Sequence, residues 1–208
     1  MDEATDPART VYIVDDDASM RDSLALMLGL LGHRTVCFDS AETFLAAHQE
    51  QWSGCVVADL KLPGKSGLEL QAELRARGSE LPCVIITAHG DVSSARTAFQ
   101  SEAVDFIEKP FDEAELRAAI EKGLAQESER VQRARAAGDE AARLAQLTPR
   151  ERQVLDLVGQ GLHAKEIARD LGISPRTVEV HKARLMTKLG ARNVSELVRF
   201  ALAANPRP

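Results

Sequence analysis

The chain has 208 residues, of which 44% are hydrophobic and 28% charged, and its formal net charge is −6. It has no run of roughly 18 apolar residues that could span a membrane. Residues 1–9 show no signal-like apolar stretch, and three widely spaced cysteines argue against a disulfide framework or a zinc site. We therefore expect a cytoplasmic globular protein of one or two domains, without a membrane partner.

The charge is unevenly distributed along the chain. Residues 1–126 hold 11 Lys and Arg against 22 Asp and Glu, which gives −11. Residues 127–147 hold 4 basic and 4 acidic residues, so their net charge is 0. Residues 148–208 hold 11 basic and 6 acidic residues, which gives +5. An acidic first part and a basic last part suggest that only the last part meets a polyanion.

Strand-like and helix-like stretches alternate through the first part. Short apolar runs rich in β-branched residues predict strands, and the stretches between them have the spacing of amphipathic helices. The predicted strands are 10–14, 35–38, 55–58, 82–86 and 104–107, and the predicted helices are 18–31, 41–50, 66–77, 92–101 and 112–125. This order predicts an α/β domain with a five-stranded, doubly wound parallel sheet.

Several of these strands run into residues that can carry chemistry. The first runs into Asp15-Asp16-Asp17, the third into Asp59 before Leu60-Lys61-Leu62-Pro63-Gly64, the fourth into Thr87 and the fifth into Lys109. The carboxyl ends of parallel strands meet at one edge of a sheet, so we expect a carboxylate cluster beside one lysine. Oxygen ligands suit Mg²⁺, and an Asp carboxylate can accept a phosphoryl group.

Each of these residues also has an ordinary interpretation. Asp15–Asp17 are typical of an acidic helix N-terminus, Asp59 of a turn before Pro-Gly, and Lys109 of a solvated surface. Their joint position at the ends of predicted strands favours a site.

Residues 10–125 resemble the receiver domain of two-component response regulators, a domain of flavodoxin-like fold. The matching motifs are Val14-Asp15-Asp16-Asp17, Asp59-Leu-Lys-Leu-Pro-Gly, Thr87-Ala-His-Gly and Lys109-Pro-Phe. The resemblance implies that a sensor histidine kinase phosphorylates Asp59, with Mg²⁺ held by Asp15, Asp16, Asp59 and the backbone carbonyl of Lys61. It makes Thr87 the switch hydroxyl, Phe106 the aromatic switch and Lys109 the phosphoryl contact. Glu102 departs from the family, which usually has Gly there, and puts the end of the fourth helix in doubt.

A helical pattern continues past residue 125. Leu116, Ile120, Leu124 and Val131 keep helical spacing, and charges of alternating sign follow up to residue 145. We predict a helix that leaves the first domain and becomes an exposed linker over 126–147, with Gly138 as its weak point. A short coiled coil between two protomers is the alternative, although Ala and Arg at the seam positions make a poor heptad.

The last part, 148–208, is predicted as an all-α, four-helix domain. Thr148-Pro149-Arg150-Glu151 is a capping box that starts a helix up to Val158, and further helices are predicted at about 163–171, 175–189 and 194–204. The short turn Gly172-Ile173-Ser174 between the second and third helices is typical of a helix-turn-helix, whose third helix here would read DNA.

The predicted reading helix separates into a core side and an outward side. Helical spacing places Val178, Leu185 and Leu189 in the core, and it places Lys182 near the buried side, from which its long side chain could still extend to DNA. Thr177, His181 and Lys188 lie along one edge, where phosphate contacts are expected. The full set of predicted DNA contacts is Arg176, Thr177, Glu179, Val180, His181, Lys182, Ala183, Arg184 and Lys188.

Residues 148–208 resemble the LuxR-type output domain, through Thr148-Pro-Arg-Glu-Arg-Gln-Val-Leu, Lys165-Glu-Ile-Ala and Ser174-Pro-Arg-Thr-Val-Glu-Val-His. With the receiver, the chain is similar to the FixJ/NarL family of transcription factors. The resemblance implies base reading by Glu179, Val180 and Ala183, and a dimer contact through Val194, Leu197, Val198, Ala201 and Leu202. It also implies contact with RNA polymerase. Glu179 is acidic where relatives have Lys, so the target sequence cannot be carried over from the family.

The domains are therefore predicted as a receiver at 1–125, a helical linker at 126–147 and a DNA-binding domain at 148–208. Phosphorylation of Asp59 is expected to promote a homodimer that binds double-stranded DNA and regulates transcription. One alternative is a phosphatase with an Asp nucleophile, since Asp15-Asp16-Asp17 loosely matches an Asp-x-Asp motif. Such an enzyme would have no use for 148–208. The other alternative is an adaptor whose helix-turn-helix binds a protein.

Overall fold

The computed structural model describes residues 10–88 and 103–204. The chain divides into two compact units, residues 1–132 and 133–208, and each has hydrophobic cores of its own. Within the described ranges, no helix has both the length and the apolar character that crossing a membrane requires.

The first unit is built on a five-stranded parallel sheet, as the sequence predicts. Its strands are β1 (Thr10–Val14), β2 (Arg34–Phe38), β3 (Cys55–Asp59), β4 (Cys83–Thr87) and β5 (Asp105–Glu108). Their order in the sheet is β2-β1-β3-β4-β5, so the central β3 lies between β1 and β4. The register pairs Val14 with Ala58 and Asp59 with Ile86, which brings the carboxyl ends of these strands to one edge.

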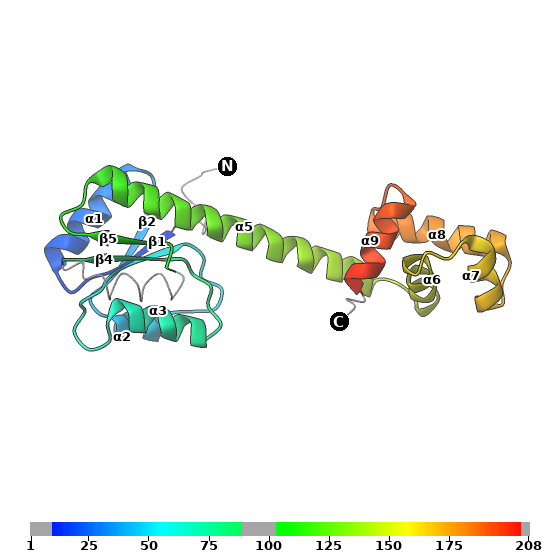
Figure 1. Ribbon diagram of the computed structural model, residues 1–208, viewed down its shortest axis with the longest axis horizontal. Coiled ribbons are helices and arrows are strands. Elements are labelled where there is room, and N and C mark those ends of the chain that lie inside the picture. Colours follow the sequence, from blue (N-terminus) through cyan, green and yellow to red (C-terminus); the bar gives the residue numbers. More distant parts are fainter. Residues whose placement is uncertain (1–9, 89–102, 205–208) are drawn as a thin grey trace. The chain divides into compact units, whose positions relative to one another are not determined.

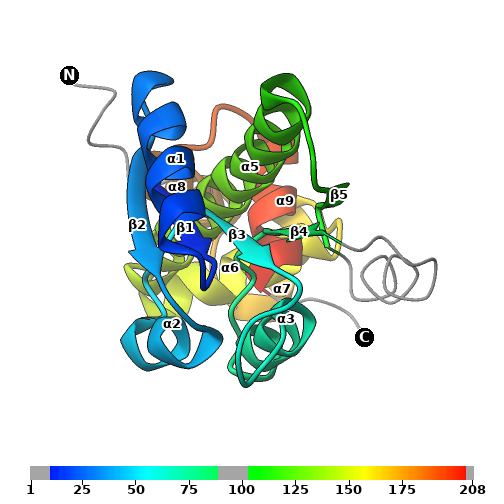
Figure 2. The same cartoon turned by 90° about the vertical axis from the view of Figure 1, so that its left-hand side faces the viewer.

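Helices cover both faces of this sheet (Figures 1 and 2). On one face, α1 (Ala18–Leu30) and the first part of α5 (Glu113–Ala145) pack on a core that includes Val57, Leu28 and Ile120. On the other, α2 (Ala41–Ala47) and α3 (Gly67–Ala76) pack on a core that includes Phe44 and Leu70. Helix α2 is shorter than predicted because His48 has extended backbone angles (φ −57°, ψ 136°). The predicted helix 92–101 lies outside the described residues.

Helix α5 continues without a break for 33 residues. Its buried positions end at Glu127, and every residue from Gln132 to Asp139 is exposed. The helix thus extends past residue 125, is exposed over residues 132–139 and passes through Gly138.

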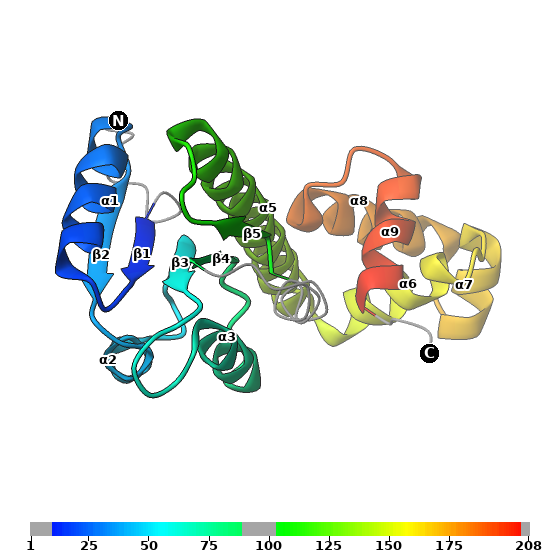
Figure 3. The same ribbon diagram turned by 60° about the vertical axis from the view of Figure 1, so that its left-hand side comes forward.

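The second unit contains four short helices in its described part (Figure 3): α6 (Pro149–Gly159), α7 (Ala164–Leu171), α8 (Pro175–Leu189) and α9 (Val194–Ala204). The predicted capping box is present, because Thr148 Oγ1 accepts the Glu151 N–H and Glu151 accepts the Thr148 N–H. Gly172 ends α7 in the left-handed region (φ 64°), which a residue with a side chain rarely adopts. Val178, Leu185 and Leu189 are fully buried, as the helical spacing predicts.

Candidate functional site

Three carboxylates gather at the carboxyl edge of the sheet. Asp59 is the last residue of β3, and Asp15 and Asp16 follow β1 directly. One oxygen of each lies within 4.8 Å of an oxygen of the others. Asp15 and Asp59 are buried, with 1% and 8% of their surface exposed, whereas Asp16 faces solvent. The structure therefore brings together the three carboxylates that the sequence proposes, with Asp16 on the open side.

Lys109 places its ammonium between the two buried carboxylates. Its Nζ lies 2.7 Å from Asp59 Oδ2 and 3.0 Å from Asp15 Oδ2. Burial lowers the pKa of Lys109, but the hydrogen bonds and charges of Asp59 and Asp15 raise it by more, so the net pKa lies above its ordinary value. Three carboxylates and one ammonium carry a net charge of −2.

Backbone N–H groups hold the other oxygens of the buried carboxylates. The Asp17 N–H donates to Asp15 Oδ1 at 2.9 Å, and the Lys61 N–H donates to Asp59 Oδ1 at 3.0 Å. Arg21, which sequence reasoning missed, donates from Nη1 to the Asp15 carbonyl at 2.7 Å. An arginine on the second turn of a helix has no pattern that marks it in the sequence. Both carboxylates are thus oriented before any ligand arrives.

The two predicted switch residues lie on β4, the strand next to that of Asp59, and on β5, one strand further. Thr87 ends β4 with none of its surface exposed, and its carbonyl accepts the Lys109 N–H at 2.6 Å. Phe106 on β5 pairs in register with Ile85 and is partly buried against the core under α2 and α3. Ser101, Glu102 and the His89-Gly90 motif lie outside the described residues.

The donor set fits a hard divalent cation. The three clustered side chains all offer carboxylate oxygens, and the net charge of −2 equals the charge that Mg²⁺ would neutralise. An open pocket of about 560 Å³ adjoins Lys109, lined largely by apolar groups of Met20, Leu24, Met27 and Phe111.

The second candidate site is the outward side of α8. Helices α7 and α8 and the turn at Gly172 form the predicted helix-turn-helix, and the Ser174 hydroxyl accepts the Thr177 N–H at 3.1 Å to start α8. Exposed residues on α8 include Arg176, Glu179, Val180, Ala183 and Arg184. Thr177 and His181 are partly buried at the edge of this surface.

Two lysines of α8 carry ion pairs inside the unit. Lys182 lies 3.1 Å from Glu179 and keeps only 17% of its side chain exposed, in agreement with its predicted position near the buried side. Lys188 Nζ lies 2.6 Å from Glu151 Oε2 and also donates to the Gln146 carbonyl at 3.3 Å. Lys188, which was predicted at the phosphate-contacting edge, thus already pairs within the unit with a buried carboxylate 37 residues earlier in the chain.

Helix α9 also needs a correction. Leu197 and Ala201 are 0% and 4% exposed and belong to the core of the unit, so they cannot also form the predicted dimer surface. Val194 and Leu202 are about half exposed and Val198 is partly buried. The part of the predicted surface that remains available is therefore Val194, Val198 and Leu202.

Comparisons with known proteins match both units. A family model described as the response regulator receiver domain matches residues 11–121. A second, described as bacterial regulatory proteins of the luxR family, matches residues 145–201. The second match begins before residue 148, and Leu144 and Leu147 do pack in the core of the second unit.

Relatives and solved structures cover nearly the whole chain. The chain is 46% identical to the transcriptional regulatory protein FixJ of Bradyrhizobium diazoefficiens over 194 residues. These aligned residues cover 93% of this chain and 95% of that one. It is 38% identical to the transcriptional regulatory protein TdiR of Thauera aromatica over 95% of this chain and 87% of that one. The structure of the response regulator StyR is 42% identical, with a TM-score of 0.83 over 92% of this chain and 96% of that one. The structure of full-length FixJ from B. japonicum is 45% identical, with a TM-score of 0.58 over 96% of this chain and 98% of that one.

Proposed function

Because the chain belongs to the response regulators, with a receiver domain followed by a luxR-type DNA-binding domain, we propose that Asp59 is its phosphoacceptor. The family makes the chain a phosphorylation-controlled regulator of transcription and not an enzyme. The observation that supports this choice is the position of Lys109 between Asp59 and Asp15. Of the three clustered carboxylates, Asp59 lies at the end of the central strand with 12% of its side chain exposed, against 1% for Asp15.

We propose the following division of roles at this site. The phosphoryl group leaves a histidine nitrogen of the sensor kinase and bonds to a carboxylate oxygen of Asp59. The Lys109 ammonium then stabilises the negative charge on the phosphoryl oxygens. The apolar pocket between α1 and the start of α5 gives the kinase a surface beside the site. Asp15, Asp16, Asp59 and the Lys61 carbonyl would hold Mg²⁺, which supplies further charge neutralisation when bound.

We propose that the new charge acts through Thr87 and Phe106. A phosphoryl group adds up to two negative charges and strong acceptor oxygens next to a buried hydroxyl at the end of β4. Movement of Thr87 toward these oxygens would change the packing of Phe106 one strand away, and so bias the β5 side of the receiver toward a homodimer. The partial burial of Phe106 supports this route, because a half-buried ring can repack without opening the core.

We propose that dimers bind double-stranded DNA through α8. The exposed side of α8 combines Arg176 and Arg184 with the small residue Ala183, which lets the helix lie close to base edges. Glu179 could accept a hydrogen bond from a cytosine amine, although its pair with Lys182 must open first. Two copies would pair through Val194, Val198 and Leu202, and the bound dimer would contact RNA polymerase.

The test is Asp59→Asn in the full-length chain, with Asp105→Asn as a matched control on β5. Acetyl phosphate and Mg²⁺ should add one phosphoryl group to the wild type and to the control but not to Asp59→Asn, as read by intact mass. Asp59→Asn should also lose the phosphate-dependent dimers, as measured by light scattering. A modified Asp15, or phosphate-induced dimers that persist in Asp59→Asn, would contradict the assignment.

A further inference from the structure

The loop that follows Asp59 is fixed at only a few points. It runs from Leu60 to Ser66, and the Gly67 N–H closes it by donating to the Leu60 carbonyl at 3.1 Å. Near its start, the Lys61 N–H donates to Asp59 Oδ1, and the Leu62 side chain is buried against the core. The part of the loop between Leu62 and α3 contains Pro63, which has no N–H, and Gly64, and both residues are exposed. Its backbone therefore needs support from outside the loop.

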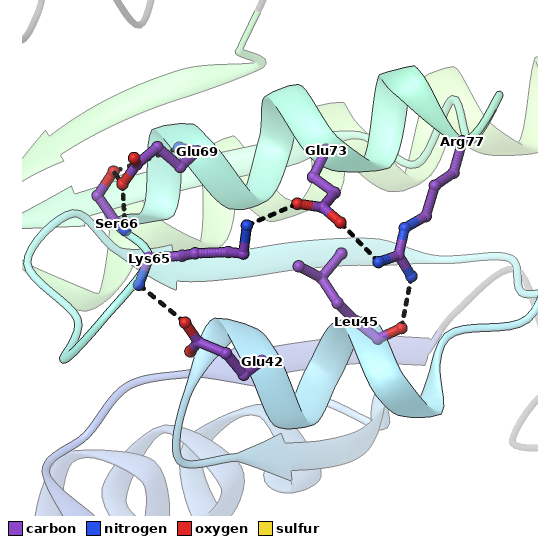
Figure 4. Close-up of polar contacts among 7 residues, drawn as sticks. All are labelled: Glu42, Leu45, Lys65, Ser66, Glu69, Glu73 and Arg77. Carbon is purple, nitrogen blue, oxygen red and sulfur yellow. Dashed lines mark hydrogen bonds and ion pairs between the residues drawn. The ribbon is translucent and has the colours of Figure 1, made fainter.

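Glu42, at the first turn of α2, supplies that support (Figure 4). Its Oε1 accepts the Lys65 N–H at 3.0 Å, across 23 residues of sequence. The same oxygen lies 2.6 Å from the point where a Cβ on Gly64 would be, and Gly64 has a φ of +80°. A Cβ at this position would force the flexible Glu42 carboxylate to shift, and the positive φ would strain any residue that has a side chain, so glycine is the residue that suits this position.

Helix α2 is itself held against α3 at its other end (Figure 4). Arg77 donates from Nη1 to the Leu45 carbonyl at 2.7 Å and from Nη2 to Glu73 Oε1 at 2.7 Å. The other Glu73 oxygen accepts Lys65 Nζ at 2.8 Å. The hydrogen bond and charge of Glu73 raise the pKa of Lys65, and those of Lys65 and Arg77 lower the pKa of Glu73, so the contacts persist across the neutral range. Glu42 thus presents its carboxylate from a helix whose position is fixed.

We propose that Glu42 is a positioning residue for the metal site. By fixing the Lys65 end of the loop, it limits the shapes that the Lys61 peptide can adopt beside Asp59, and so pre-organises the backbone group proposed as a ligand. The inference rests on the proposed function of the site. Residues that orient metal ligands directly change metal affinity by about 10- to 100-fold when mutated. Glu42 acts four residues away through the loop backbone, so we expect a weakening of about 3- to 10-fold.

The experiment measures Mg²⁺ affinity by calorimetry with full-length protein. Glu42→Ala removes the acceptor, whereas Glu42→Gln removes the charge but keeps an oxygen that can accept the Lys65 N–H. Glu50→Ala removes an exposed charge from the loop after α2 and controls for long-range electrostatics. We expect Glu42→Ala to bind Mg²⁺ about 3- to 10-fold more weakly, and the other two variants to stay within about twofold of the wild type.

A second readout without metal separates positioning from general stability. In EDTA, amide hydrogen exchange should accelerate in Glu42→Ala at residues 61–65 and stay unchanged in the strands. Unaltered Mg²⁺ affinity in Glu42→Ala, equal weakening in Glu42→Gln, or faster exchange throughout the receiver would each overturn the inference. Loss of Mg²⁺ binding in Asp16→Asn supports the proposed site itself, and a wild type that binds no Mg²⁺ would instead refute that site.

Discussion

The ion pair between Glu151 and Lys188 predicts an acid-sensitive output domain. Glu151 is 3% exposed and accepts hydrogen bonds from Lys188 Nζ at 2.6 Å and from the N–H and hydroxyl of Thr148 at 2.9 and 3.0 Å. The hydrogen bond from Lys188 is the main reason that the pKa of Glu151 falls to about 2 from 4.5, against burial, which raises it. The pair therefore favours the folded state at neutral pH.

The magnitude follows from the pKa and the exposure of the pair. A pKa of about 2 in the folded state against 4.5 in the unfolded state corresponds to at most about 3 kcal/mol. Because 34% of the Lys188 side chain is exposed, solvent screening reduces this to about 1–2 kcal/mol. The folded-state pKa is depressed, so this stability is fully present above pH 4.5 and is lost as the pH falls from 4.5 toward 2.

The assay compares Glu151→Gln with the wild type by urea unfolding at pH 7 and pH 3, followed by far-ultraviolet circular dichroism. Trp52 and Tyr12, the only tryptophan and tyrosine of the chain, stack in the receiver, so fluorescence reports that unit separately. Glu151→Gln should lose about 1–2 kcal/mol in the helical transition at pH 7, less at pH 3, and nothing in the fluorescence transition.

A matched control is Glu166→Gln, since Glu166 accepts the His163 N–H in the capping position of α7 but faces solvent. It should lose less than about 0.5 kcal/mol. A double-mutant cycle with Lys188→Met should give a coupling of about 1–2 kcal/mol. Equal losses in Glu151→Gln and Glu166→Gln, or a Glu151→Gln loss that is the same at pH 3 as at pH 7, would refute the reasoning.

Three further predictions follow from individual contacts. Binding of phosphorylated protein to duplex DNA should weaken steeply with salt, and Arg184→Gln should reduce the slope of log K against log salt by about 1, whereas Lys188→Gln should leave the slope unchanged; equal slopes for the two variants would contradict the internal role of Lys188. Lys109→Ala leaves Asp15 and Asp59 without their shared cation, so in EDTA the Trp52 transition should lose about 1–3 kcal/mol, and Mg²⁺ should restore part of it; an effect that Mg²⁺ does not reduce would argue against a common electrostatic site. Gly138 is exposed inside α5 with nothing within 4 Å of an added Cβ, so Gly138→Ala should stabilise the helix locally by about 0.5–1 kcal/mol and slow amide exchange around it about two- to fivefold; exchange that speeds up would show that the glycine is needed for a bend.

The receiver fold and the carboxylate cluster were accessible from sequence because both depend on short-range patterns. An apolar run that ends in a charged residue predicts both a buried strand and the location of that charge at the sheet edge. Asp15, Asp59 and Lys109 meet for this reason, although 94 residues separate Asp15 from Lys109. To predict that these residues meet at one edge of the sheet, it was enough to predict that the strands are parallel.

Contacts between side chains on different elements could not be predicted in this way. The spacing of α8 gives the direction of Lys188, but not the carboxylate of Glu151 that it meets from α6. The same holds on α9, where apolar spacing marks Leu197 and Ala201 without saying whether the unit's own core or a partner buries them. The structure shows that the unit's own core buries Ala201, because Ala201 packs against α6 where a side chain on Gly159 would be.

The sequence by itself determined the order of strands and helices, the caps, the clustering of acids at one edge and the helix-turn-helix, because these follow from periodicity, turn chemistry and strand direction. Only the tertiary structure decided which charges are already paired and which backbone groups are held in place. The support that Glu42 gives to the loop after Asp59 is of this second kind. It depends on the distance between two helices that pack on the same face of the sheet, and no local pattern encodes that distance.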